Sequence, residues 1–336
     1  MSRLLAALVI LACGALAVVL AWPQLFGLAW SPGVAQVVAM RGLGIAVALV
    51  LALVFTLVAR LVPAAPRVAA ALAVIALVFG AINAAVLSTR GFGDLAFTTK
   101  SDSDLTVLAW NTLGDAPGAA EIANLALEND VDVIALPETT NAMGVEIALL
   151  MQAADRPMWV HTLAYDEESK ARSTTLLVSV DLGEYDVDTQ TRTTAVLRTL
   201  VATPRDGTGP TLVVVHSVAP LPPMEGAWQQ DLRWLADACQ GDNTILAGDF
   251  NATLDHFAGL PREDGAELGA CRDAALATDN AAVGTWPTQL PALLGSPIDH
   301  VMATPNWTAT GMLVLESHDK LGSDHRPVLV QLSPSE

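Results

Sequence analysis

The sequence predicts an α/β domain with a mixed sheet, preceded by three transmembrane helices. Residues 1–90 are apolar and contain no acidic residue. From residue 105 onward, short apolar runs typical of strands alternate with amphipathic runs typical of helices. Several consecutive strand-like runs have no helix between them, which favours a mixed sheet over a purely parallel one. We therefore expect a membrane domain at 1–90, a linker at 91–104 and a second domain at 105–333.

The distribution of charged residues also divides the chain at about residue 90. The basic residues of the first 90 are Arg3, Arg41, Arg60, Arg67 and Arg90. All 35 acidic residues lie in 91–336 beside 12 of the 17 basic ones, which gives that part a formal charge of −23. The overall hydrophobic fraction of 52% is thus an average over two unlike parts.

Three apolar runs in the first part are long enough to cross a bilayer core, which takes about 20 apolar residues in a helix. The predicted spans are Leu4–Trp22, a second within Val34–Val58 and a third within Val68–Ser88. Because basic residues favour the cytoplasmic ends of spans, Arg3, Arg60 and Arg67 predict a multi-pass protein of the cell membrane with an extracellular acidic domain. Arg41 fits less well, since it falls near the outer end of the second span.

The first run and the cysteines leave alternatives open. A signal peptide could account for the first run, but two further spans follow and the mature chain would still be a membrane protein. Ile10-Leu11-Ala12-Cys13 resembles a lipoprotein cleavage site only faintly. Cys239 and Cys271 would face an oxidising exterior, where a disulfide is permitted, but pairing depends on geometry that the sequence does not give.

The acidic part reads as a series of strands with few helices after a polar linker. The predicted strands are Leu105–Trp110, Val131–Leu136, Thr175–Val180, Ala195–Ala202, Thr211–Val215, Thr244–Ala247, Ile298–Ala303, Met312–Leu315 and Pro327–Leu332. The predicted helices are Ala119–Glu128, Ala142–Ala153 and Met224–Cys239.

Polar residues sit at the C-terminal ends of several of these strands, where ligand sites of α/β sheets tend to form. They are Trp110-Asn111, Pro137-Glu138, Val215-His216, Gly248-Asp249-Phe250-Asn251, Ile298-Asp299-His300 and Ser323-Asp324-His325-Arg326-Pro327. Taken singly, each has a structural explanation. His216 could be a hydrogen-bonded structural residue, Asp249 and Asn251 could serve a turn or a helix cap, and the others could be surface groups.

Taken in order, the six motifs resemble those of the endonuclease/exonuclease/phosphatase family over roughly Leu105–Leu332. The resemblance implies a DNase I-like four-layer α/β/β/α sandwich and a metal-dependent hydrolase that acts on phosphoric ester bonds. A second, weaker resemblance, of three spans followed by such a domain, is to a bacterial membrane protein linked to teicoplanin resistance. It implies a substrate of the cell envelope.

The chemistry explains why these residue types are needed. A hard cation, Mg²⁺ or Mn²⁺, takes carboxylate and amide oxygens and neutralises charge on a phosphoryl group. We expect Glu138 and Asn111 as metal ligands, and the resemblance adds Asp324. It also implies His325 as the base that activates water, oriented by Asp299. Asp249 and Asn251 would position the water and the phosphate, and His216 would bond a phosphate oxygen or protonate the leaving group.

The strand at Ser173–Val180 lacks the arginine that many family members carry there, and whether Arg172 replaces it is open. Abasic-site endonucleases have an active-site tyrosine without a clear counterpart here, which weakens a DNA-repair interpretation.

Charge and anchoring together guide the choice of substrate. Nucleic-acid binding rests on Lys and Arg, so a domain of charge −23 favours a lipid-linked or small phosphoester at the bilayer over nucleic acid. The alternatives are an extracellular membrane-tethered nuclease and a non-catalytic membrane-tethered scaffold. No protein partner is predicted.

Overall fold

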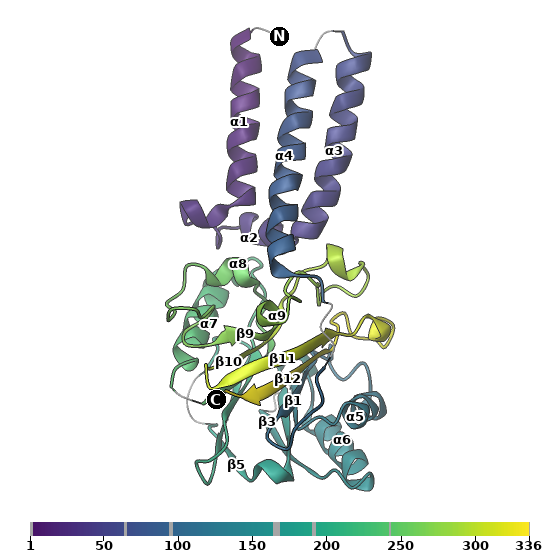
Figure 1. Cartoon of the computed structure of the whole chain (residues 1–336), viewed down its shortest axis with the longest axis vertical. Helices are drawn as coiled ribbons and strands as arrows, with labels where there is room; N and C mark the ends of the chain where they lie inside the picture. The colour runs from purple at the N-terminus through teal and green to yellow at the C-terminus, as the bar shows by residue number, and fades with distance from the viewer. Residues whose placement is uncertain are drawn as a thin grey trace.

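A computed structural model describes residues 3–63, 66–93, 97–163, 169–189, 193–241 and 243–335. A block of long helices stands at one end of the molecule and a sheet-rich domain at the other (Figure 1). The helices are α1 Arg3–Ala21, α2 Val34–Ala39, α3 Arg41–Leu61, α4 Pro66–Arg90, α5 Ala119–Glu128, α6 Asn141–Ala153, α7 Glu225–Ala238, α8 Leu254–Phe257 and α9 Ala274–Ala277. The predicted linker 91–104 includes residues 94–96, which lie outside the described ranges.

Twelve strands in the described ranges form two six-stranded mixed sheets. One sheet has the order β11-β12-β1-β2-β4-β3 and the other β5-β6-β7-β8-β10-β9. The strands are β1 Leu105–Ala109, β2 Val133–Pro137, β3 Met158–Leu163, β4 Thr174–Ser179, β5 Tyr185–Val187, β6 Leu200–Pro204, β7 Thr211–His216, β8 Thr244–Asp249, β9 Arg272–Asp273, β10 Asp299–Ala303, β11 Trp307–Val314 and β12 Val328–Pro334. The mixed sheet predicted from consecutive strand-like runs is confirmed.

The sheets pack face to face, with helices on their outer faces. Alternate residues of both sheets, such as Val107 and Val214, form the core between them. The opposite face of the first sheet packs on α5 and α6 through residues such as Ile122 and Ile147, and that of the second packs on α7 through Trp228. The predicted four-layer α/β/β/α sandwich of the DNase I-like fold is thus confirmed.

Each sheet contains one parallel pair joined through a helix. β1 and β2 are parallel with α5 between them in sequence, and β7 and β8 are parallel with α7 between them. The other pairings are antiparallel. The carboxyl ends of a parallel pair lie at the same edge of a sheet, so each half of the sandwich gathers two strand ends at one edge.

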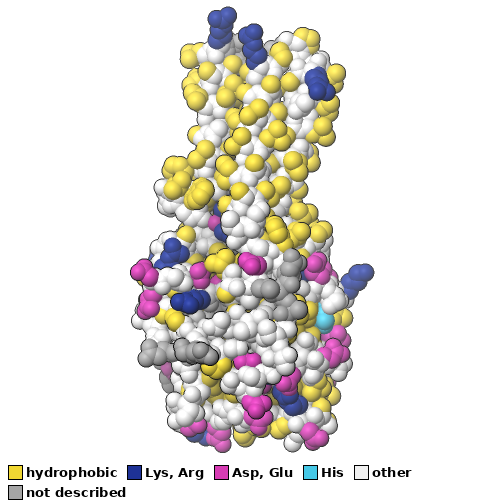
Figure 2. Space-filling model, in the orientation of Figure 1, with side chains coloured by type: hydrophobic (Ala, Val, Ile, Leu, Met, Phe, Trp, Pro, Cys, Tyr) yellow, Lys and Arg dark blue, Asp and Glu magenta, His cyan; other side chains and the backbone are white. Residues whose placement is uncertain are grey.

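The helical block contains three helices, α1, α3 and α4, that are long and apolar enough to cross a membrane. Figure 2 shows apolar side chains covering this block, basic side chains at its far end and acidic ones over the domain. The second span, predicted within Val34–Val58, needs correction. It is divided into the short helix α2 and the long helix α3, which runs to Leu61. The break falls at Met40, just before Arg41 turns toward the domain.

A buried ion-pair cluster joins the helical block to the domain. Arg41 makes a two-pronged contact with Asp255, at 2.9 Å from Nε and 2.7 Å from Nη2, and Arg90 lies 2.9 Å from the same carboxylate. Gln24 donates to Asp255 at 2.6 Å, and Arg41 donates to the Asn83 side chain of α4. We call these five residues the junction cluster. A planar guanidinium suits such pairing, which explains why an arginine is placed at this end of α3.

His256, beside the junction cluster, is held in its neutral form. Its Nδ1 accepts from the Thr253 N–H at 2.9 Å, and its Nε2 donates to the carbonyl of Ala35 in α2. Burial lowers the pKa of His256 to about 4, although Asp255 acts in the opposite direction. Burial alone would raise the pKa of Asp255, but Arg41 and Arg90 hold it well below its usual value.

Both shifts predict that acid weakens this junction. A histidine whose folded pKa is depressed contributes stability above its unfolded pKa of about 6.5, and that contribution is lost as the pH falls toward the folded value. For His256 the loss is about 2 kcal/mol at about pH 5. We expect the difference in melting temperature between the wild type and His256→Gln, measured on the full chain in detergent, to shrink between about pH 7 and about pH 5. A difference independent of pH would contradict this.

A disulfide joins Cys239, just after α7, to Cys271, with the Cα atoms 5.8 Å apart. It closes a loop of 32 residues, for which the loss of entropy in the unfolded chain is worth about 3 to 4 kcal/mol. We expect Cys239→Ala/Cys271→Ala to lower the melting temperature of the full chain by about 10 °C. Cys13→Ala, which removes the free cysteine of α1, is the control and should leave it unchanged. Equal melting temperatures in all three proteins would argue against a stabilising disulfide.

Candidate active site

The candidate site lies at the edge of the sandwich where both parallel pairs end. Asn111 follows β1 and Glu138 follows β2, while His216 and Asp249 are the last residues of β7 and β8. These strands belong to different sheets, so packing of the two sheets brings the four side chains together. Sheet topology and the packing of the two sheets therefore place residues from four segments at one site.

Two further segments enter the site from antiparallel strands. β10 begins at Asp299, which lies opposite Asp249 in the register of β8 and β10. The loop before β12 carries Asp324 and His325. Ser323 fixes this loop, because its hydroxyl donates to the Asn111 carbonyl at 2.6 Å and accepts from the His325 N–H at 3.0 Å.

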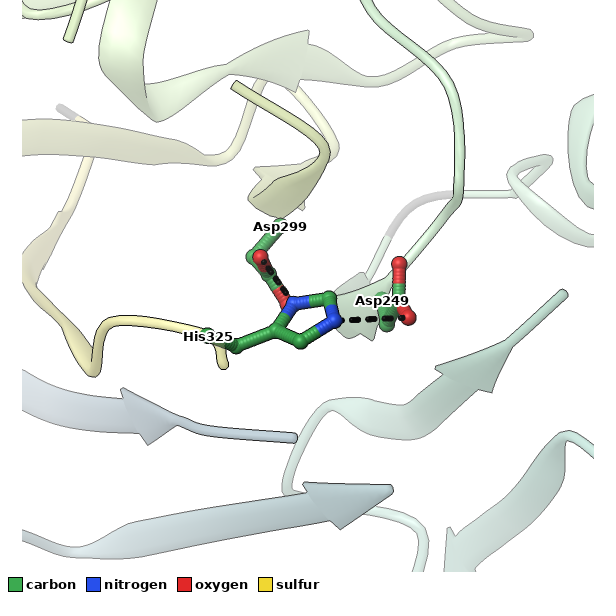
Figure 3. Close-up of side chains that lie close together, drawn as sticks. All are labelled: Asp249, Asp299 and His325. Atoms are coloured by element: carbon green, nitrogen blue, oxygen red, sulfur yellow. Dashed lines mark hydrogen bonds and ion pairs between the residues drawn. The ribbon is translucent and has the colours of Figure 1, made fainter. Parts of the chain in front are cut away.

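His325 lies between two carboxylates (Figure 3). Its Nδ1 is 2.8 Å from Asp299 Oδ2, and its Nε2 is 3.8 Å from Asp249 Oδ2. Asp324 Oδ1 lies 3.9 Å from the same Nε2. Asp299 accepts the hydrogen bond from Nδ1–H, so Nε2 is the nitrogen that faces the interior of the site.

Asn111 links the carboxylates of the two sheets. Its Nδ2 donates to Glu138 Oε1 and to Asp249 Oδ2, each at 3.1 Å. Its Oδ1 accepts from the Leu113 N–H at 3.0 Å. The amide therefore holds the two acids near one another, and it must rotate before its oxygen can act as a ligand.

Asn251 and His216 complete the contact network. Asn251 donates to Asp249 at 3.1 Å and to the Ser217 carbonyl at 2.9 Å, with a left-handed φ of 46°. Glu138 also has a left-handed φ, of 57°. Such conformations are uncommon for non-glycine residues and cluster at functional sites. His216 Nε2 lies 3.9 Å from Glu138 and Nδ1 lies 3.3 Å from the Thr174 hydroxyl.

Burial and the excess of acidic residues shift the pKa values of several side chains in the site. Burial lowers the pKa of His216 to about 3, so this side chain is neutral near pH 7. Burial raises the pKa of Glu138 and of Asp249, and neighbouring carboxylates add to both shifts. Burial alone would lower the pKa of His325, but Asp299 and Asp249 raise it well above its usual value. Without a cation, His325 is therefore protonated.

The donor set fits a hard divalent cation. Glu138, Asp249, Asp299 and Asp324 surround one protonated histidine, and buried oxygens of Asp299 and Asp324, both Oδ1, have no hydrogen-bond partner in the described structure. Oxygens of this kind are ligands for Mg²⁺ or Mn²⁺. Ligand atoms of Asp249, Asp299 and His325 also lie within 4.8 Å of one another. His325 Nδ1 is already bonded to Asp299, so we favour an oxygen site around Glu138 and Asp324.

The structure thus brings together all eight residues singled out in the sequence, which are Asn111, Glu138, His216, Asp249, Asn251, Asp299, Asp324 and His325. Three further residues support this network, of which Thr174 and Ser323 were given no role in the sequence. Thr174 contacts His216, Ser323 fixes the final loop, and Trp286 donates to Asp324 Oδ2 at 2.9 Å. The Ser-Asp-His motif in the sequence contains Ser323 and could have identified it as a supporting residue of the site. Arg172 donates to the Val196 carbonyl at 3.5 Å.

The endonuclease/exonuclease/phosphatase family model matches residues 108–325, which spans every residue of this site. The chain belongs to the endonuclease/exonuclease/phosphatase family. Family members are metal-dependent hydrolases that act on phosphoric ester bonds, so the predicted enzyme class is confirmed. No curated protein matches the chain significantly.

Solved structures of the family share the fold. An endonuclease/exonuclease/phosphatase from Beutenbergia cavernae DSM 12333 is 18% identical, with a TM-score of 0.53 over 69% of this chain and 72% of that one. D. rerio TDP2 humanised by 14 mutations is 18% identical, with a TM-score of 0.51 over 69% of this chain and all of that one. D. rerio TDP2 complexed with a single-strand DNA product is 17% identical, with the same TM-score and coverage.

Proposed function

We propose that the chain is a membrane-anchored, Mg²⁺- or Mn²⁺-dependent phosphoesterase that hydrolyses a lipid-linked or small phosphodiester, phosphomonoester or pyrophosphate. The observation that carries the proposal is the convergence of four acids and two histidines at the sheet edge that lies against the helical block. The proposed organisation is a membrane domain at 1–90, a linker at 91–104 and a catalytic domain at 105–333.

Each residue of the site has a role that follows from its contacts. Glu138 and Asp324, with Asn111 after rotation of its amide, would hold the cation, which neutralises charge on the phosphoryl oxygens. Asp299 holds the imidazole of His325 so that Nε2 faces the interior, where it takes a proton from the attacking water. A bound cation would offset the negative field around His325, so this histidine would act as the base in the loaded site.

The remaining residues position the reactants. Asp249 accepts hydrogen bonds from Asn111 and Asn251, and its position beside His325 suits a group that aligns the water. Asn251 would bind the phosphate. His216 is buried and its Nε2 has no hydrogen-bond partner in the described structure, so it would contact a phosphate oxygen or the leaving group once the ring carries a proton on that nitrogen.

Three features support a membrane anchor with an extracellular catalytic domain. Three helices are long and apolar enough to cross a bilayer. Arg3, Arg60 and Arg67 lie at the helix ends away from the domain, where cytoplasmic arginines would be expected. The disulfide suits an oxidising space. Protease added to intact cells should therefore cleave the acidic domain, and its protection would place the domain in the cytoplasm.

The nuclease alternative draws on one similar structure and meets one physical objection. D. rerio TDP2 is seen with a single-strand DNA product. A domain with a formal charge of −23 repels a long polyanion. We therefore favour a membrane lipid as the substrate, with the bilayer itself as partner.

The test uses the full chain in detergent. Mg²⁺-dependent hydrolysis of bis-(p-nitrophenyl) phosphate should be measured first, and then a panel of plasmid DNA, phospholipids and lipid pyrophosphates. We expect metal-dependent turnover and faster hydrolysis of a lipid than of DNA. Faster nicking of plasmid would favour the nuclease, and an absence of any turnover would favour a non-catalytic scaffold.

A further inference from the structure

We infer that the cavity between α1, α3 and α4 holds the hydrocarbon chain of the substrate while its phosphate occupies the site. The inference rests on the proposed function and makes its substrate class specific. The cavity has a volume of about 590 Å³, within the range of small-molecule sites. Its lining is almost entirely apolar and includes Leu16, Leu20, Val47, Leu51, Phe55 and Phe79.

The cavity exists because α1 packs less closely than the other two helices. α3 and α4 approach through small residues, since a Cβ on Gly80 would lie 3.4 Å from that of Ala48. In α1, only Ala21 is buried. A dry, apolar cavity between membrane helices is filled by hydrocarbon rather than by water.

One polar side chain of the cavity lining contacts the loop that follows His216. Gln36 of α2 lines the cavity, and its Nε2 donates to the carbonyl of Pro220. Pro220 lies four residues after His216, a stretch that spans at most about 14 Å. A substrate whose hydrocarbon lies beside Gln36 would need a headgroup of a few polar units to place its phosphate at His216.

Three segments of the site edge touch the helical block, so this edge of the domain lies against the block. The loop after β7 contacts Gln36, and His256 in α8 contacts Ala35. The segment Ala292–Leu294 packs closely on Gly42. Any side chain at position 42 would collide with the backbone of this segment. The side chains of Leu221 and Leu293, on two of these loops, are 56% and 50% exposed, as suits loops at a bilayer surface.

The experiment separates recognition of the substrate's hydrocarbon chain from catalysis. Ala17→Phe in α1 and Ala76→Phe in α4 fill the cavity, because both alanines line it. Ala15→Phe and Ala81→Phe place the same ring on the exposed faces of the same helices. Each full-length protein is assayed in mixed micelles with a long-chain phospholipid, with its short-chain analogue, and with bis-(p-nitrophenyl) phosphate.

We expect the cavity variants to lose about tenfold in kcat/KM on the long-chain lipid, the loss expected when one to two methylenes no longer fit an apolar site. Their rates on the two soluble substrates, and all rates of the control variants, should stay within about twofold of wild type. Equal loss on all substrates, or no loss on the long chain, would overturn the inference and leave the phosphoesterase in place. No turnover of any phosphoester by the wild type would instead sink the proposed function.

Discussion

Replacing His325 with glutamine is expected to lower kcat for bis-(p-nitrophenyl) phosphate by about 10³-fold, the typical contribution of a positioned general base. Glutamine keeps a donor for Asp299, so the buried carboxylate retains a partner and the protein should fold. His325→Ala would leave Asp299 unpaired and combine loss of function with loss of stability.

The control is His161→Gln, on the edge strand β3 away from the site network. Its rate should stay within about twofold of wild type. Asp299→Asn tests the positioning role separately, because it keeps the shape but weakens the field on the imidazole. We expect a smaller loss of kcat and a shift of the pH–rate profile to lower pH, since Asp299 raises the pKa of His325. A His325→Gln enzyme as fast as wild type would exclude this base.

Glu138→Gln should produce the second large effect, on metal dependence. Removing a charged ligand is expected to raise the Mg²⁺ concentration needed for half-maximal activity by about 100-fold or more. Melting temperature gives an independent readout. Burial and neighbouring acids raise the pKa of Glu138, so the neutral variant should be at least as stable as wild type without metal. It should, however, gain little stability when Mg²⁺ is added.

Glu146→Gln, on the exposed face of α6, is the matched control and should respond to Mg²⁺ like wild type. If Glu138→Gln shows an unchanged Mg²⁺ response in both activity and melting temperature, Glu138 is not a ligand. The metal site would then be assigned to Asp249 and Asp299, whose oxygens also lie close to one another.

Local sequence patterns predicted the helices and strands that have a strong hydrophobic periodicity or are bounded by a clear turn. The helix expected at Ala119–Glu128 has these bounds, and the strand expected at Thr211–Val215 is one residue longer. The edge strand β3, Met158–Leu163, was missed because Trp-Val-His-Thr gives no clean alternation. β5 and β9 were missed because they are only three and two residues long.

Tertiary contacts explain what the sequence could not give. Arg41 seemed misplaced in a membrane span because its partner, Asp255, lies more than 200 residues away in the chain. The six site motifs could be found at strand ends, but their convergence depends on how two sheets pack. The amide orientation of Asn111 is set by Leu113, Glu138 and Asp249 together, which no local pattern encodes.

The junction cluster has a kinetic consequence. Removing one partner of a buried ion pair costs about 3 to 5 kcal/mol, so a domain held through Asp255 by Arg41 and Arg90 cannot swing freely on a tether. The distance of the domain from the helical block is therefore fixed. With the membrane anchor and the lipid substrate proposed above, an enzyme held in this way would meet its substrate in two dimensions, and its rate would follow the mole fraction of substrate in the lipid layer rather than the bulk concentration.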